Sequence, residues 1–275
     1  MKADKIKEIV KSRYAEVALH NMPCCGTRKS CCGGSDAEDA SKKVGYHDMD
    51  LRSVPEGSNL GLGCGNPVAL ASLKEGDVVL DLGSGAGFDA FLAAPRVGSS
   101  GKVIGVDMTP EMVDKAKANA VKGGFQNVDF RLGEIENLPV SSSEVDVIIS
   151  NCVINLSPEK RKVFKEAFRV LKPGGRLMVS DLVLLKPLPE IVRQSVEEYV
   201  GCVAGAVMKD EYLAAITAAG FRDLEVVGED VYPVELAVND PVGRAIYSDT
   251  TLASKSAKQI WGSVASVKIS AVKPS

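Results

Sequence analysis

Cysteines are the residues of this chain best suited to unusual chemistry. The 275 residues include seven of them: Cys24, Cys25, Cys31, Cys32, Cys64, Cys152 and Cys202. The number is odd, and the first ten residues lack the apolar core of a signal peptide, which argues against a secreted disulfide framework. Three kinds of chemistry remain open: buried structural thiols, a metal or metalloid site, and redox exchange.

Four of the cysteines lie in one short segment, residues 23–35, together with three glycines. The two adjacent pairs lack the C-x2-C spacing of ordinary zinc sites, which disfavours structural zinc. Arg28 and Lys29 lie between the pairs and could lower the pKa of neighbouring thiols. We expect a loop here. A metalloid-capturing role and a set of spare exposed thiols both remain open.

The other three cysteines are spread along the chain. Cys64 lies among the turn formers of residues 60–67, which predicts an irregular loop. Cys152 follows an apolar run that reads as a buried strand, and Cys202 lies in a stretch of small residues that permits close backbone packing. Each of the last two, taken alone, is more often a core residue than a ligand. Together, three thiols could form a soft ligand set for a thiophilic ion.

A glycine loop supplies a second constellation. The apolar run Val78–Leu82 leads into the loop Asp81–Phe88, which reads G-x-G-x-G rather than the G-x-G-x-x-G of nicotinamide enzymes. Asp107 ends the next strand, 20 positions after Gly87, where an acid would receive the hydroxyls of a ribose. The alternative is a tight strand-to-helix turn in an unrelated α/β domain.

The elements around these residues alternate between strands and helices. We predict a helix over residues 1–20, helices that begin at 109–111 and at 157–159, and strands over 78–82, 103–107, 128–132, 145–151 and 177–180. Pro95 should end or kink the helix after the glycine loop. Strand-like segments recur at 224–227 and 266–272. The alternation predicts an α/β protein with a Rossmann-like, doubly wound parallel sheet.

The loop Asp81–Phe88 resembles the first motif of class I S-adenosylmethionine-dependent methyltransferases. Residues 62–67, 105–112, 150–156 and 202–206 are similar to motifs of the arsenite methyltransferases, and the likeness covers about residues 60–225. It implies an N-terminal helix and Cys-rich loop (1–58), an S-adenosylmethionine-binding domain (59–184) and a smaller C-terminal α+β domain over the substrate (185–275). The cofactor-binding residues it implies are Asp81, Gly83, Ser84, Gly85, Gly87, Asp107, Met108, Gly133, Glu134, Ile135 and Asn151.

The same resemblance implies a reaction. Cys64, Cys152 and Cys202 would bind arsenite and methylated trivalent arsenicals for methylation in arsenic detoxification. An upstream cysteine, for which we choose Cys32, would exchange disulfides with thioredoxin or a glutathione-like thiol. Trivalent arsenic attacks through its own lone pair, so no general base is required, in keeping with a chain that has only two histidines, both before the sheet. Because bound thiols must be deprotonated, arsenic affinity should rise with pH through about 8–9.

Composition sets the broader limits. The apolar fraction is 45%, the charged fraction 25% and the net charge −3, values typical of a soluble globular protein with no attraction to nucleic acid or anionic membranes. No apolar run of about 18 residues suggests a membrane span. We therefore expect a cytoplasmic monomer. Two alternative functions remain: a carbon or oxygen methyltransferase acting on a quinone- or sterol-like acceptor, and a non-catalytic metalloid-binding module.

Overall fold

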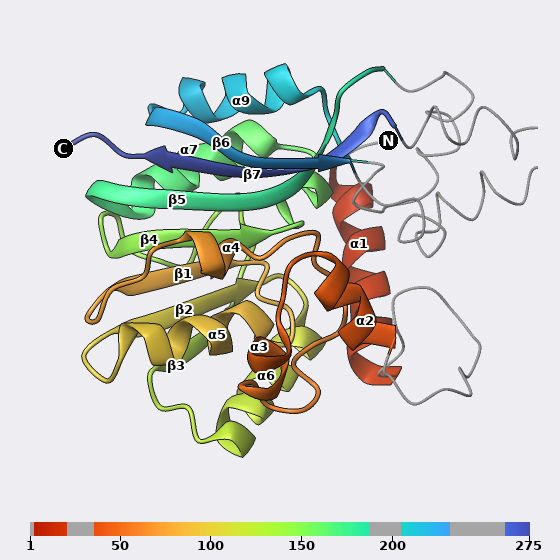
Figure 1. Cartoon of the computed structure of the whole chain (residues 1–275), viewed down its shortest axis with the longest axis vertical. Helices are drawn as coiled ribbons and strands as arrows, with labels where there is room; N and C mark the ends of the chain where they lie inside the picture. The colour runs from red at the N-terminus through yellow and green to blue at the C-terminus, as the bar shows by residue number, and fades with distance from the viewer. Residues whose placement is uncertain (1–2, 21–35, 188–204, 232–261) are drawn as a thin grey trace, which may run out of the picture.

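A seven-stranded β-sheet forms the centre of the computed structural model, which describes residues 3–20, 36–187, 205–231 and 262–275 (Figure 1). The strands are β1 (Val78–Leu82), β2 (Lys102–Asp107), β3 (Val128–Leu132), β4 (Val145–Asn151), β5 (Leu171–Leu184), β6 (Arg222–Val231) and β7 (Val264–Val272). Their order across the sheet is β3-β2-β1-β4-β5-β7-β6. Strands β1 to β5 pair in parallel, and β7 runs antiparallel to both of its neighbours.

Helices cover both faces of the sheet. In β1, Leu80 and Leu82 face one side and Val79 faces the other, and all three are buried. The first face is covered by α7 (Lys160–Val170) and α9 (Lys209–Ala218), and the second by α5 (Phe88–Val97) and α6 (Pro110–Gly123). A strand buried on both sides carries a nearly continuous apolar run. The five predicted strands are confirmed, and all but the edge strand β3, in which only Phe130 is buried, contain such a run.

Further helices precede the sheet in the sequence. They are α1 (Ala3–His20), α2 (Asp36–Lys43), α3 (Asp48–Arg52) and α4 (Pro67–Leu70), and a 3-10 helix, η1 (Ile154–Leu156), follows β4. Helix α1 confirms the one predicted over residues 1–20, and its Val17 and Ala18 pack against Met112 of α6. Helices α2 and α3 were not predicted, because they are too short to show an apolar period.

The C-terminal strands extend the predicted parallel sheet, whose strands β1 to β5 are parallel as expected. Both strand-like segments of the predicted C-terminal domain belong to the same sheet as β1–β5, with β7 inserted between β5 and β6. The sheet is consequently mixed. The predicted boundaries at residues 58 and 184 stay predictions, since residues 188–204 and 232–261 lie outside the described residues.

Three local signals acted differently from our expectation. Thr109 stands at the N-cap of α6, but its side chain makes no cap hydrogen bond. The helix predicted from residues 157–159 begins at Lys160, because the Ser157 hydroxyl binds the Glu159 amide and the Glu136 carboxylate ahead of it. Pro95 lies inside α5, which ends at Val97.

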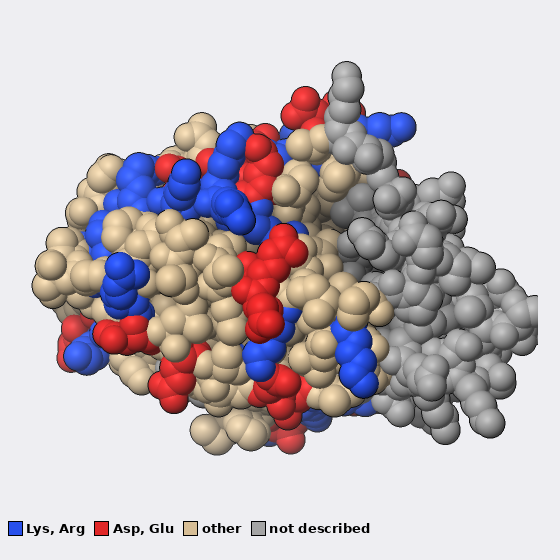
Figure 2. Space-filling model, turned by 90° about the horizontal axis from the view of Figure 1, so that it is seen from above, with Lys and Arg blue, Asp and Glu red and all other residues tan. Residues whose placement is uncertain are grey.

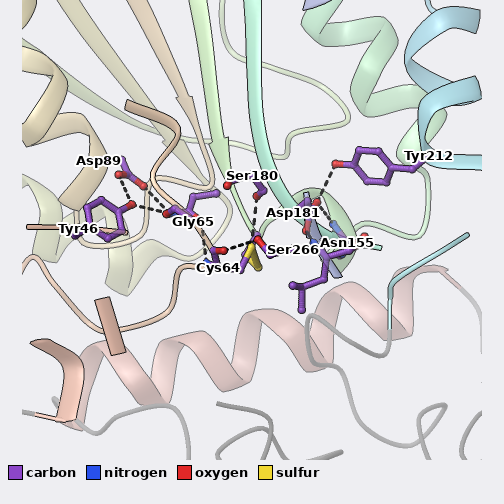
Figure 3. Close-up of a disulfide and its surroundings, with 12 residues drawn as sticks. Tyr46, Cys64, Gly65, Asp89, Asn155, Ser180, Asp181, Tyr212 and Ser266 are labelled. Carbon is purple, nitrogen blue, oxygen red and sulfur yellow. Dashed lines mark hydrogen bonds between the residues drawn. A yellow bond between two sulfur atoms is a disulfide. The ribbon is translucent and has the colours of Figure 1, made fainter. Parts of the chain in front are cut away.

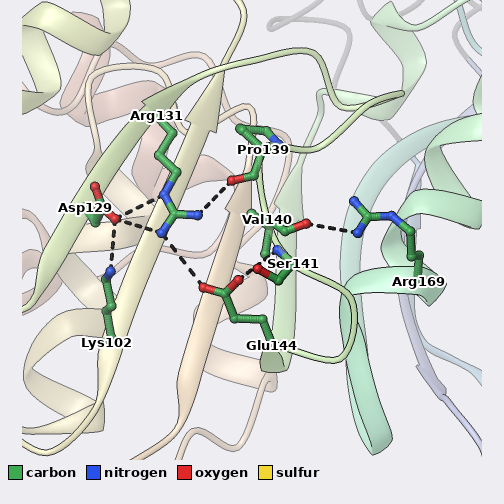
Figure 4. A network of polar contacts seen from close by, with 8 residues as sticks. All are labelled: Lys102, Asp129, Arg131, Pro139, Val140, Ser141, Glu144 and Arg169. Carbon is green, nitrogen blue, oxygen red and sulfur yellow. Dashed lines mark hydrogen bonds and ion pairs between the residues drawn. The ribbon is translucent and has the colours of Figure 1, made fainter.

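Polar contacts fasten the β3 edge to the loop that leads to β4 (Figure 4). Asp129 accepts hydrogen bonds from Lys102 and Arg131, and Arg131 donates to the Pro139 carbonyl at 2.7 Å. Such exposed pairs add little stability, about 0–1 kcal/mol each. Their effect is to position the loop that carries Ile135, a residue of the pocket described below.

The surface carries both signs of charge. In Figure 2, basic side chains gather on the upper part of the visible face, with acidic side chains interspersed and beside them. This mixture accords with the small net charge of −3. Within the described residues, no helix has the length and apolar character needed to cross a membrane.

Candidate active site

A pocket opens at the carboxyl ends of β1, β2 and β4. β1 pairs with β2 on one side and with β4 on the other. Successive strands are therefore added to one side of β1 up to β3 and to its other side from β4 on, which makes this edge the topological switch point of the sheet. In open α/β sheets this switch point is where ligands bind. The lining residues come from the glycine loop, the strand ends, α1, and residues 58–63.

The glycine loop forms one wall of the pocket. Gly87 has φ +95°, and a Cβ there would lie 2.6 Å from the Phe91 ring and 2.8 Å from the Phe130 ring. Gly83 has φ +64°, and a Cβ would lie 2.3 Å from Val153. Both positions therefore require glycine for backbone conformation and for space. The loop leaves room for a ligand to approach its backbone closely.

Asp107 lies at the end of β2 and lines the pocket. Its Oδ2 accepts a hydrogen bond from the Gly85 amide and its Oδ1 one from the Thr109 amide, both at 2.9 Å. Burial raises the pKa of Asp107, and these amides oppose the rise. Each carboxylate oxygen has a second lone pair, which suits it to accept hydrogen bonds from the hydroxyls of a ribose.

Among the described residues, three that line this pocket have a buried polar atom without a hydrogen-bond partner: Asn59 (Nδ2), Asp81 (Oδ2) and Ser84 (Oγ). Burial raises the pKa of Asp81 well above its usual range, and the nearby Asp89 and Asp107 carboxylates raise it further. Buried polar groups without partners indicate a missing ligand. Three acids around one pocket favour a ligand with positive charge, as S-adenosylmethionine has.

Asn151 connects this pocket to the cysteines. Its Oδ1 accepts from the Cys64 amide at 3.0 Å, and its Nδ2 donates to the Gly65 carbonyl at 2.9 Å and to the Asp89 carboxylate at 3.0 Å. The Tyr46 hydroxyl lies 2.8 Å from the same Nδ2 and donates to Asp89 at 2.6 Å (Figure 3). Asn151, predicted to bind the cofactor, lines the pocket, and its amide holds the Cys64 loop in place.

Sequence reasoning missed Tyr46 and Asp89. Burial raises the pKa of Asp89 to about 6, against the lowering effect of hydrogen bonds from Tyr46 and Asn151. The only local signal was an acid directly after the glycine loop, at the start of α5. Its partner Tyr46 lies 43 positions earlier in the chain, so no spacing rule could have joined the two.

Cys64 and Cys152 meet at the end of β4 and form a disulfide, with 5.8 Å between their Cα atoms (Figure 3). Cys152 has φ +58°, a left-handed conformation that is uncommon outside glycine. Its amide donates to the Ser180 carbonyl at 2.8 Å. The structure thus brings together two of the three predicted ligands. They are joined here as a disulfide, because the fold holds the two sulfurs within bonding distance.

Asp181 is the third group beside the sulfurs. One of its carboxylate oxygens and the two sulfur atoms all lie within 4.8 Å of one another. The Tyr212 hydroxyl donates to Asp181 at 2.9 Å, and the Asn155 and Leu182 amides donate at 3.1 and 2.9 Å. Burial raises the pKa of Asp181 to about 6, which these hydrogen bonds oppose. Sequence reasoning missed this acid, which directly follows the segment predicted as the fifth strand.

The remaining predicted site residues do not all lie in the pocket. Met108 and Ile135 line the pocket, whereas the Glu134 carboxylate lies 2.7 Å from the Lys7 ammonium of α1. Gly133 follows β3, and its amide donates a hydrogen bond to the Asp107 carbonyl at the end of β2. The predicted ligand Cys202 and the exchange cysteine Cys32 lie outside the described residues, as do Cys24, Cys25 and Cys31. Their roles therefore stay predictions.

Gly205 follows Cys202 by three positions and belongs to the described residues. A Cβ at Gly205 would fall 1.8 Å from the Asn155 carbonyl oxygen. Gly205 thus packs closely against the backbone of Asn155, whereas residues 199–204 lie outside the described residues. Asn155 itself donates to Asp181 through its amide, so Gly205 packs against a residue that contacts the carboxylate beside the sulfurs.

Comparisons with known proteins agree with this geometry. The profile of a family described as "Methyltransferase domain" matches residues 73–220. The chain is 48% identical over 234 residues to an arsenite methyltransferase of Halobacterium salinarum, a match that covers 82% of this chain and 60% of the relative. It is 38% identical over 253 residues to an arsenite methyltransferase of Aquipseudomonas alcaligenes, covering 89% of this chain and 70% of the relative.

A solved structure is similar over much of the chain. It is an arsenic (III) S-adenosylmethionine methyltransferase from Chlamydomonas reinhardtii, with a TM-score of 0.60 and 31% identity over 86% of this chain and 73% of that one. The chain thus spans 60% and 70% of the length of the two curated relatives, and 73% of the solved structure.

Proposed function

The chain belongs to the arsenite methyltransferase family of class I methyltransferases, and we propose that it transfers methyl groups from S-adenosylmethionine to arsenite and methylarsenite. One observation carries the proposal: Cys152, beside Cys64, lines the pocket whose other walls are the glycine loop and Asp107. Soft sulfur ligands therefore stand next to the cofactor site. The activity would serve arsenic detoxification.

The pocket residues match the parts of the cofactor. When bound, S-adenosylmethionine supplies an electrophilic methyl carbon on a positively charged sulfur. The Asp107 carboxylate would hold the ribose hydroxyls, and the glycine loop with Asp81 would hold the methionine part. Met108 and Ile135 would flank the adenine. The unsatisfied oxygens of Asp81 and Ser84 support this assignment, since a bound ligand would supply their partners.

The cysteines would hold the substrate. Arsenic attacks with its own lone pair, so the chain needs to position it rather than remove a proton. No histidine is among the residues described as lining the pocket, which is consistent with transfer that needs no general base. Cys202 would be a third ligand, and Cys32 would exchange disulfides with the pair.

Before arsenic binds, the Cys64–Cys152 disulfide must be reduced to two thiols. An external thiol of the thioredoxin or glutathione type would supply the two electrons and two protons. We propose that the protein works in this way as a cytoplasmic monomer. Arsenic affinity should then rise with pH through the thiol range, about 8–9.

The test is methyl transfer from labelled S-adenosylmethionine to arsenite in the presence of a dithiol, followed by speciation of the arsenic products. We expect methylated arsenic from the wild type and at least about a hundredfold less from Cys152→Ser, since one lost ligand removes much of the positioning. Full activity of that variant would overturn the proposal. Methylation of a quinone-like acceptor, insensitive to thiol blockade, would favour the alternative enzyme instead.

A further inference from the structure

We propose that the Asp181 carboxylate stabilises the positive charge that arsenic acquires during methyl transfer, and that it accelerates this step without contributing to the binding of arsenite. The inference rests on the proposed function and deepens it, because it assigns a group that acts on the charge of the reacting atom. It applies to arsenic bound by all three predicted thiols, Cys64, Cys152 and Cys202.

The reaction moves a positive charge onto arsenic. When thiols bind arsenite, each displaced hydroxide leaves as water with the thiol proton, so the bound substrate is neutral, as free arsenite is. The arsenic lone pair then forms the As–C bond, while the bond between the methyl carbon and the sulfonium sulfur breaks and its electron pair stays on that sulfur. Arsenic, formally oxidised from the trivalent to the pentavalent state, carries the charge that the sulfonium has lost, and no proton moves. A negative charge close to arsenic therefore stabilises the transition state more than the ground state.

Asp181 is the acid on the arsenic side of this transfer. One of its carboxylate oxygens and the sulfurs of Cys64 and Cys152 lie within 4.8 Å of one another. The three acids of the cofactor pocket, Asp89 among them, surround the site proposed for the positively charged cofactor, whereas Asp181 does not line that pocket. In Figure 3 the disulfide lies between Asp89 and Asp181. The positive charge thus moves away from the pocket acids and toward Asp181.

The surroundings of Asp181 suit its ionised form. The Tyr212 hydroxyl and the Asn155 amide donate to Oδ2, and the Leu182 amide donates to Oδ1. All three contacts are donors, and a carboxylate has only acceptor positions to offer them. Lys160 lies close enough to lower the pKa of Asp181, but its ammonium donates to two backbone carbonyls rather than to the carboxylate. Because Asp181 is fully buried, little water screens its charge.

This role affects the rate of methyl transfer and not the affinity for arsenite. With a charge separation of about 5 Å, an effective dielectric constant of about 20 and a half-developed charge on arsenic, loss of the carboxylate should slow methyl transfer about tenfold. Arsenite is neutral before and after it binds, so its affinity should hardly change. A residue that bound arsenic directly, or that only supported the fold of the site, would change the affinity as well.

The experiment measures both quantities on the reduced full chain. Equilibrium dialysis without cofactor gives the affinity for arsenite, and rapid mixing of the arsenite-loaded protein with saturating labelled S-adenosylmethionine gives the single-turnover rate constant. We expect Asp181→Asn to slow methyl transfer about tenfold and to change the affinity by less than about twofold. Asp181→Ser, a smaller neutral replacement, should do the same. Lys160→Gln removes an opposing positive charge and should speed methyl transfer about twofold, the opposite sign.

Asp129→Asn is the matched control, because its carboxylate makes only half-exposed ion pairs on the β3 edge, and it should change neither quantity. A wild-type rate in the Asp181 variants, a loss of affinity as large as the loss of rate, or a slower rate in Lys160→Gln would overturn the inference and leave the proposed function intact. If neither Asp181 variant folds, the rate of Lys160→Gln decides alone. Absence of labelled arsenic in the wild type would instead overturn the proposed function itself.

Discussion

Asn151→Ala should loosen the cysteine pair, because the Asn151 amide holds the Cys64 loop. Truncation removes the acceptor of the Cys64 amide and the donor to the Gly65 carbonyl and the Asp89 carboxylate. At about 1 kcal/mol for each hydrogen bond, the free energy of unfolding should fall by about 3 kcal/mol. For a domain of this size the melting temperature should drop by about 6–12 °C.

Asn127→Ala is a matched control for this prediction. The Asn127 amide donates two hydrogen bonds, to the Ala94 and Gly98 carbonyls, far in sequence from either cysteine. Its truncation should cost about 2 kcal/mol, again at about 1 kcal/mol for each bond. Both variants should therefore melt at a lower temperature, by amounts that differ only modestly.

The assay separates stability from positioning. Phenylarsenite binding to the reduced protein is measured well below both melting temperatures. We expect Asn151→Ala to weaken it about tenfold, since Cys64 no longer has a fixed position beside Cys152, and Asn127→Ala to leave it unchanged. Wild-type affinity in Asn151→Ala, with the predicted loss of melting temperature, would refute the idea that Asn151 positions Cys64.

Further predictions concern the cofactor pocket. Gly87→Ala should lower the free energy of unfolding by about 2 kcal/mol and weaken S-adenosylmethionine binding in calorimetric titration, whereas Gly124→Ala, at φ +71° with open space around it, should cost about 1 kcal/mol and leave binding alone. Because the pKa of Asp89 is raised to about 6, its neutral form stabilises the fold, and this contribution is lost as pH rises from about 4 to about 6. Urea titrations should show that the free energy of unfolding falls less over this pH range in Asp89→Asn than in the wild type, by at most about 3 kcal/mol. Lys7→Met removes the ion pairs of α1 with Glu134 and Glu136 and should weaken S-adenosylmethionine binding about threefold, while Lys122→Met, which removes an exposed pair with Glu56, should not.

Features formed by neighbouring residues could be predicted from the sequence. Strands β1, β2, β4 and β5 contain apolar runs because helices cover both faces of the sheet, whereas the edge strand β3 buries only Phe130. The glycine loop and Asp107 could be placed at one edge, since the carboxyl ends of parallel strands meet there. The resemblance to arsenite methyltransferases, carried by short motifs around Cys64 and Cys152, is confirmed by relatives that match most of the chain.

Features that depend on distant residues could not be predicted. The insertion of β7 between β5 and β6 reflects packing of the whole sheet rather than any local pattern. Tyr46 reaches Asp89 across 43 positions, and Tyr212 reaches Asp181 across 31. The apolar period of a helix or strand says nothing about such pairs. The disulfide was missed for the same reason, since 88 positions separate its two cysteines.

The central claim is that arsenic held at the cysteine pair receives the methyl group. A single-turnover measurement tests it most directly: reduced protein is loaded with arsenite, freed of unbound arsenite and mixed with labelled S-adenosylmethionine. Labelled methylarsenic should appear in proportion to the bound arsenic in the wild type and be absent in Cys152→Ser. Equal label on arsenic in both proteins, or label that appears only on other acceptors, would contradict the claim.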